Sequence, residues 1–175
     1  GVADITTKEP VSPHTSFNLG SISKTFVSNA ILILQQRHQL SVEDNLAKYF
    51  PGFKNKMIAQ KVQIKHLLSH VSGLPDCREV SKNPTFYLTA DDEQNFAPIQ
   101  QTDTLVFEPG SKYEYSNPAF NGLALIIEKI TKAKWQDFVK KEIFEKAALK
   151  ESDITDGPHP ETGVSHGYEN ENGVY

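Results

Sequence analysis

Apolar residues recur at helical spacing in five parts of the chain. In the first, Phe26, Ala30 and Leu34 share one face of a helix that would lie against a core. The fourth begins at Pro118, a residue favoured in the first helical turn. The predicted helices span residues 21–36, 42–50, 64–70, 118–130 and 135–147.

Local signals predict where two of these helices begin or end. Ser41 and Asp44 approximate a capping box, so the second helix is expected to start directly after Ser41. The third is expected to stop at Gly73, because glycine suits the left-handed conformation that ends many helices.

Few segments have the pattern of a β-strand. Only residues 1–6 and 104–107 qualify, and residues 75–112 hold four prolines and no sustained period, which predicts an irregular excursion over the surface. A chain this helical with isolated strand ends is expected to have lost its sheet.

Composition excludes several classes of protein. The net charge of −4, from 18 basic and 22 acidic side chains, argues against a dedicated nucleic-acid binder. Apolar runs such as Ala30 to Leu34 stay far short of the roughly 20 residues of a membrane-spanning helix. The single cysteine excludes an intrachain disulfide.

Ser21 and Lys24 are the first pair with possible chemistry. Three residues apart on a helix, they lie on one face, where a lysine could serve as the base that activates a serine hydroxyl. The structural alternative is a helix start, with Ser21 as the N-cap and Lys24 solvated.

Tyr115 and Asn117 are a second candidate pair. A phenol beside an amide could relay a proton and hold a substrate carbonyl, but Asn117 directly precedes Pro118 and could instead cap the fourth helix. His66 and His70 have the spacing of two metal ligands on a helix, yet no glutamate lies between them. The residues therefore indicate neither a metal nor a cofactor.

Several ordered segments together resemble the serine β-lactamase and penicillin-binding-protein superfamily. The branch they suggest contains class C β-lactamases, D-alanyl-D-alanine carboxypeptidases and related esterases, and Gly1 to Asp4 looks like the end of the hairpin that precedes the nucleophile helix there. The segments that carry the resemblance are Phe17–Phe26 (FNLGSISKTF), 40–44 (LSVED), 66–74 (HLLSHVSGL), Pro109-Gly110 and 113–117 (YEYSN).

The resemblance implies a role for each matching residue. Ser21 would be the acylated nucleophile, with its own backbone N–H forming half of an oxyanion hole, and Lys24 would be the base or proton shuttle. Tyr115 would share the proton transfers, Asn117 would bind the substrate amide, and His70 would belong to packing of the helical region. The implied fold is α/β (α+β), of the β-lactamase/transpeptidase type, mostly helical in these residues and with the main antiparallel sheet largely missing. The full protein would be an extracytoplasmic serine hydrolase, acting through an acyl-enzyme on a β-lactam, a D-Ala-D-Ala peptide or an ester.

One element of the family pattern does not occur in this sequence. Members carry a Lys-Thr-Gly or His-x-Gly strand that lines the cleft, whereas His166-Gly167 lies too early and lacks a strand context. Residues 1–175 are therefore expected to be a partial domain, truncated before this third motif, with a missing segment or a second chain completing the sheet. The alternatives are a non-catalytic relative that binds cell-wall peptide or a protein partner, and an inactive fragment.

Overall fold

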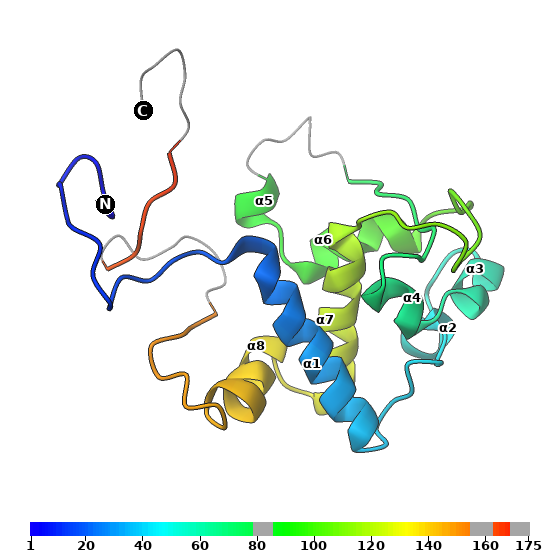
Figure 1. Ribbon diagram of the computed structural model, residues 1–175. Coiled ribbons are helices and arrows are strands. Elements are labelled where there is room, and N and C mark those ends of the chain that lie inside the picture. The colour runs from blue at the N-terminus through cyan, green and yellow to red at the C-terminus, as the bar shows by residue number, and fades with distance from the viewer. Residues whose placement is uncertain (79–85, 155–162, 169–175) are drawn as a thin grey trace, which may run out of the picture.

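The computed structural model describes residues 1–78, 86–154 and 163–168, and within these ranges the chain is mostly helical, as predicted (Figure 1). A short 3-10 turn, η1 (Gly20–Ile22), leads into α1, and a π-helical segment (Lys140–Phe144) follows α8. In the same ranges β-structure is limited to three isolated bridges. The α-helices are α1 (Ser23–Gln36), α2 (Leu46–Tyr49), α3 (Lys56–Lys61), α4 (Ile64–Leu68), α5 (Phe86–Thr89), α6 (Asp92–Gln100), α7 (Asn117–Thr131) and α8 (Trp135–Val139).

Helix α7 is the centre of the fold, and α1, α4, α6 and α8 all pack against it (Figure 1). Nine of its fifteen residues are buried, which is why its sequence is apolar on nearly every side. It ends at Lys132, which adopts the left-handed conformation at φ +58° and donates its backbone N–H to Glu128 O.

Helices α6 and α7 approach closely at Gly122. A β-carbon at this position would lie 2.6 Å from the ring of Phe96, and that residue is fully buried. The absence of a side chain at residue 122 is therefore what allows the two helices to cross at this distance.

We expect Gly122→Ala to destabilise the protein by about 1–2 kcal/mol. Overpacking a core typically costs about 1–3 kcal/mol, and the better helix propensity of alanine offsets up to about 1 kcal/mol of it. Urea unfolding measures the change. Gly52→Ala is the matched control, because nothing lies within 4 Å of the added β-carbon there. Equal stability of the two variants would contradict the close crossing.

Two predicted features of the first half of the chain are wrong in detail. Ser41 to Asp44 forms a turn, in which the Ser41 N–H bonds Asp44 Oδ2 at 2.9 Å, and α2 begins only at Leu46. The reason is that Asn45 is extended and bridges Gln63. Helix α3 was not predicted at all.

In its described residues, the excursion predicted for 75–112 contains two helices, α5 and α6; its residues 79–85 lie outside the described residues. Asp91 and Gln94 form a capping box at the start of α6, with the Gln94 N–H donating to Asp91 Oδ1 at 2.7 Å and the Asp91 N–H donating to Gln94 Oε1 at 2.9 Å. The sequence pattern obscures this helix because Pro98 lies inside it. Ile99 and Phe96 nevertheless anchor it in the core.

The segment after α4 is hydrogen-bonded to the loop that precedes α7. Helix α4 ends at Leu68, and the first left-handed residue after it is His70, at φ +56°, rather than the predicted Gly73. Gly73 is instead needed for a close backbone contact, because a β-carbon there would lie 2.0 Å from Phe107 O. The Val106 N–H donates to Gly73 O at 2.8 Å, so the loop around Val106 lies directly against the backbone at Gly73.

The first residues of the chain lie beside residues 163–168, apart from the helical body (Figure 1). Neither predicted strand forms: the first is reduced to a bridge between Val2 and Pro10, and residues 104–107 have no strand partner among the described residues. His166 donates its backbone N–H to Ala3 O at 2.9 Å. Ile22 in η1 and Leu32 in α1 are 56% and 48% exposed.

Candidate active site

Ser21 and Lys24 meet at the start of α1. Asn18 Oδ1 accepts the backbone N–H of Gly20 at 2.8 Å, and Gly20 adopts φ +52°, which turns the chain into η1. Lys24 Nζ donates to Ser21 Oγ at 3.1 Å. Ser21 makes no capping bond to the helix, and Lys24 is half-buried rather than solvated, so the structural alternative for this pair is wrong.

Tyr115 and Asn117 reach the same place from the start of α7. The Tyr115 hydroxyl donates to Ser21 Oγ at 2.6 Å, and Lys24 Nζ donates to Asn117 Oδ1 at 2.8 Å. The structure therefore joins all four predicted site residues in one hydrogen-bonded cluster, although Ser21 and Tyr115 are 94 residues apart in the sequence.

The cap of α7 explains why the Asn117 side chain can reach Lys24. Ser116 is the N-cap, with its Oγ accepting the Ala119 N–H at 3.3 Å, and Asn117 is the first helical residue. The proposed capping role of Asn117 is thus wrong, and Ser116 was not predicted to cap this helix. The signal was present, because serine is among the preferred N-cap residues and Pro118 occupies the second helical position.

The charge of Lys24 dominates the electrostatics of the cluster. Burial alone would raise the pKa of the Tyr115 phenol, but its hydrogen bonds to Lys24 and Ser21 and the nearby ammonium charge outweigh burial and hold that pKa below its ordinary value of 10. Lys24 Nζ also lies 5.0 Å from the ring centroid of Tyr115 and 5.8 Å from that of Phe120. The lysine therefore makes the Tyr115 phenol easier to ionise than an isolated tyrosine.

The two histidines with metal-ligand spacing, His66 and His70, each accept a different backbone N–H at Nδ1. His66 Nδ1 accepts the Gln63 N–H at 3.1 Å, within the capping box of α4, whereas His70 Nδ1 accepts the Ser116 N–H at 3.1 Å. No three His, Cys, Asp or Glu side chains in the described part of the chain gather as a metal site.

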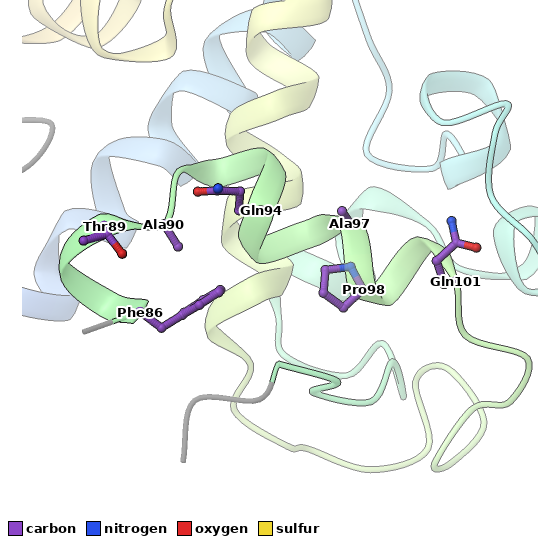
Figure 2. A pocket seen from close by; sticks show the side chains of 7 residues that line it. All are labelled: Phe86, Thr89, Ala90, Gln94, Ala97, Pro98 and Gln101. Carbon is purple, nitrogen blue, oxygen red and sulfur yellow. The ribbon is translucent and has the colours of Figure 1, made fainter. Parts of the chain in front are cut away.

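A hollow of about 340 Å³ opens next to the cluster. Lys24 and Asn117 contribute to its wall, together with Phe120 and Trp135. A larger hollow of about 490 Å³ lies along α5 and α6, where Phe86 and Pro98 line it (Figure 2). No ionisable side chain lines that second hollow, whereas Lys24 lines the first.

The fold and the cluster together define the class of protein. It has a β-lactamase/transpeptidase-type fold and carries a serine and a lysine at the start of helix α1. A family model described as Beta-lactamase matches residues 1–174, and the chain belongs to this β-lactamase and penicillin-binding-protein superfamily. The family assignment made from the sequence is confirmed, and members of this family are serine hydrolases that act on small-molecule or peptide substrates.

Individual relatives agree with the family match. Penicillin-binding protein 4* of Bacillus subtilis (strain 168) is 34% identical over 161 residues, which cover 88% of this chain and 34% of that protein. The crystal structure of a penicillin-binding protein from Bacillus halodurans superposes with a TM-score of 0.83 at 26% identity, covering 100% of this chain and 55% of that one. A D-stereospecific amidohydrolase from Streptomyces sp. gives a TM-score of 0.68 at 25% identity, with 78% and 44% covered.

The chain is shorter than its relatives. It spans about a third of the length of the curated relatives it matches and about half of the solved structures. Within the described ranges, no helix combines the length and the apolar character needed to cross a bilayer.

Proposed function

We propose that the full-length protein is a serine hydrolase that acts through an acyl-enzyme, with Ser21 as the nucleophile. One observation carries this proposal: Ser21 Oγ lies within hydrogen-bond distance of both Lys24 Nζ, at 3.1 Å, and the Tyr115 hydroxyl, at 2.6 Å. A serine hydroxyl is almost never ionised at neutral pH and needs an adjacent base, and these two groups are the candidates.

In the proposed reaction, Lys24 and Tyr115 act as one proton-accepting pair. The pair takes the proton of Ser21 Oγ while that oxygen forms a bond to the carbonyl carbon of the substrate. It then returns the proton to the leaving nitrogen or oxygen as the C–N or C–O bond breaks. Water attacks the resulting ester in the same way, releasing the acid and restoring Ser21. The lowered pKa of the Tyr115 phenol supports its part in these transfers.

Asn117 is proposed to bind the substrate amide. Because its Oδ1 accepts a hydrogen bond from Lys24, its amide nitrogen is oriented away from the lysine and can donate to a substrate carbonyl. The backbone N–H of Ser21 would supply half of the oxyanion hole, as the family resemblance implies.

We further propose that residues 1–175 are the helical part of a partial β-lactamase-like domain. The share of each relative that the chain covers and the lack of a Lys-Thr-Gly or His-x-Gly strand in this sequence support this proposal. The remaining sheet would bring the third motif to the other side of the cleft and would cover Ile22 and Leu32. The protein would act outside the cytoplasm on a β-lactam, a D-Ala-D-Ala peptide or an ester.

Covalent labelling tests the proposed function. We would incubate the full-length protein with a fluorescent penicillin and, separately, with a fluorophosphonate, and measure adducts in a denaturing gel. Labelling by either probe is expected, because only an activated serine forms a lasting adduct. A folded protein that binds cell-wall peptide and takes up neither probe would instead establish the non-catalytic alternative.

A further inference from the structure

His70 occupies a special backbone position beside the cluster. It follows the C-cap of α4, Ser69, and adopts φ +56°, a left-handed conformation that is uncommon for residues other than glycine. The proposed reaction gives this residue no role.

His70 accepts hydrogen bonds from the two residues on either side of Tyr115. The His70 carbonyl oxygen accepts the Glu114 N–H at 2.8 Å, and His70 Nδ1 accepts the Ser116 N–H at 3.1 Å. The backbone on each side of Tyr115 is therefore attached to the same residue. Because Ser116 is also the N-cap of α7, the second bond reaches the start of that helix as well.

The imidazole ring of His70 also contacts the rings of the site. Its centroid lies 4.5 Å from that of Tyr115, with the planes at 33°, and 5.0 Å from that of Phe120, with the planes at 34°. Lys24 Nζ lies near these same two rings. Tyr115 is thus held by its backbone neighbours and by its ring, while its hydroxyl remains directed at Ser21.

The hydrogen bond to Nδ1 requires the neutral imidazole. An acceptor nitrogen must carry a lone pair, so the proton resides on Nε2. Burial and, secondarily, the charge of Lys24 lower the pKa of His70 below 6.5, which keeps the ring neutral at neutral pH. The bond to Ser116 is therefore maintained under the conditions in which acylation would occur.

We infer that His70 is a positioning residue, which fixes the Tyr115 hydroxyl against Ser21 and Lys24 through the two backbone bonds and the ring contact. This inference rests on the proposed function for its effect on catalysis. A displacement of about 1 Å in a reacting group can cost about 100-fold in rate, so losing the hydrogen bond to His70 Nδ1 is expected to slow acylation.

Three variants separate the contacts of His70. His70→Phe keeps a ring and removes the acceptor. His70→Asn removes the ring but keeps an acceptor oxygen near the position of Nδ1, and asparagine tolerates φ +56°. His66→Phe is the matched control, because His66 Nδ1 also accepts a backbone N–H but at the start of α4, away from Tyr115.

The expected result is a split between acylation rate and binding. In the full-length protein, His70→Phe should lower the acylation rate with an aryl ester about 10- to 100-fold while KM changes little, whereas His70→Asn should recover most of the rate. His66→Phe should acylate like the wild type. Rates are normalised to the folded fraction measured by circular dichroism, so a loss of stability alone does not imitate the effect.

Titration of Tyr115 provides a readout that does not depend on catalysis. Tyrosine labelled with ¹³C at Cζ reports each phenol by NMR, and Tyr115→Phe assigns the relevant signal. The Tyr115 pKa should be below 10 in the wild type, in His70→Asn and in His66→Phe, and should rise in His70→Phe as the phenol leaves Lys24. Unchanged titration and unchanged acylation in His70→Phe would overturn the inference. A wild type that never acylates, together with a Tyr115 pKa that still rises in His70→Phe, would overturn the proposed function and leave the positioning of Tyr115 supported.

Discussion

Ser21→Ala is expected to abolish acylation of the full-length protein. The alanine has no oxygen to form the ester, and no other hydroxyl receives hydrogen bonds from both Lys24 and Tyr115 in the described part of the chain. With a chromogenic cephalosporin and an aryl ester, the acylation burst should fall below detection, which means a loss of at least about 1,000-fold.

Ser28→Ala is the matched control for this result. Ser28 lies on α1 about two turns beyond Ser21, so its replacement changes the same helix without touching the cluster. It should acylate at the wild-type rate. An undiminished burst in Ser21→Ala would mean that another residue is the nucleophile.

Lys24→Ala is expected to slow acylation by about 100- to 10,000-fold while substrate binding is largely retained. The substitution removes the proton acceptor, and it also removes the charge that holds the pKa of the Tyr115 phenol low. Stopped-flow measurement separates the acylation rate from the binding constant. The control is Lys48→Ala on α2, which breaks the surface ion pair between Lys48 and Asp44 and should behave like the wild type.

The double variant Ser21→Ala/Lys24→Ala tests whether Ser21 and Lys24 act together in one step or contribute to the rate independently. Residues that act together in one proton transfer are strongly non-additive, so the double variant should be little worse than Ser21→Ala alone. The measurement is residual substrate turnover, because Ser21→Ala shows no detectable burst. A further loss of turnover equal to that of Lys24→Ala would show that the lysine acts independently of Ser21.

Parts of the site could be predicted from the sequence because they are local. Ser21 and Lys24 are neighbours on a helix face whatever the tertiary structure, so their spacing already indicated the contact. The approach of Tyr115 to Ser21 depends on how α1 and α7 pack, and only the family resemblance predicted it. The same holds for Asn117, whose side chain is available because Ser116 caps the helix.

The fold was harder to predict where tertiary contacts override local signals. Pro98 hid helix α6, whose stability comes from burying Phe96 and Ile99 against α7. Ser41 and Asp44 have the residues of a helix start but form a turn, because Asn45 is extended in a bridge with Gln63. Such outcomes depend on residues distant in the sequence, which periodicity does not report.

The positioning of Tyr115 by His70 was likewise not evident from spacing. His70 was assigned to packing, and that interpretation omitted the bonds to Glu114 and Ser116, which join segments about 45 residues apart. A histidine in the left-handed conformation is uncommon, but backbone dihedral angles cannot be read from the sequence.

The site of acylation is the most direct test of the central claim. We would trap the acyl-enzyme of the full-length protein with a penicillin, digest it with trypsin, and locate the adduct by fragment-ion mass spectrometry. The peptide from Glu9 to Lys24 contains Ser12, Ser16, Ser21 and Ser23, so the fragments must resolve them. The account predicts one adduct, on Ser21; an adduct on any other residue, or turnover of the penicillin without an adduct, would contradict it.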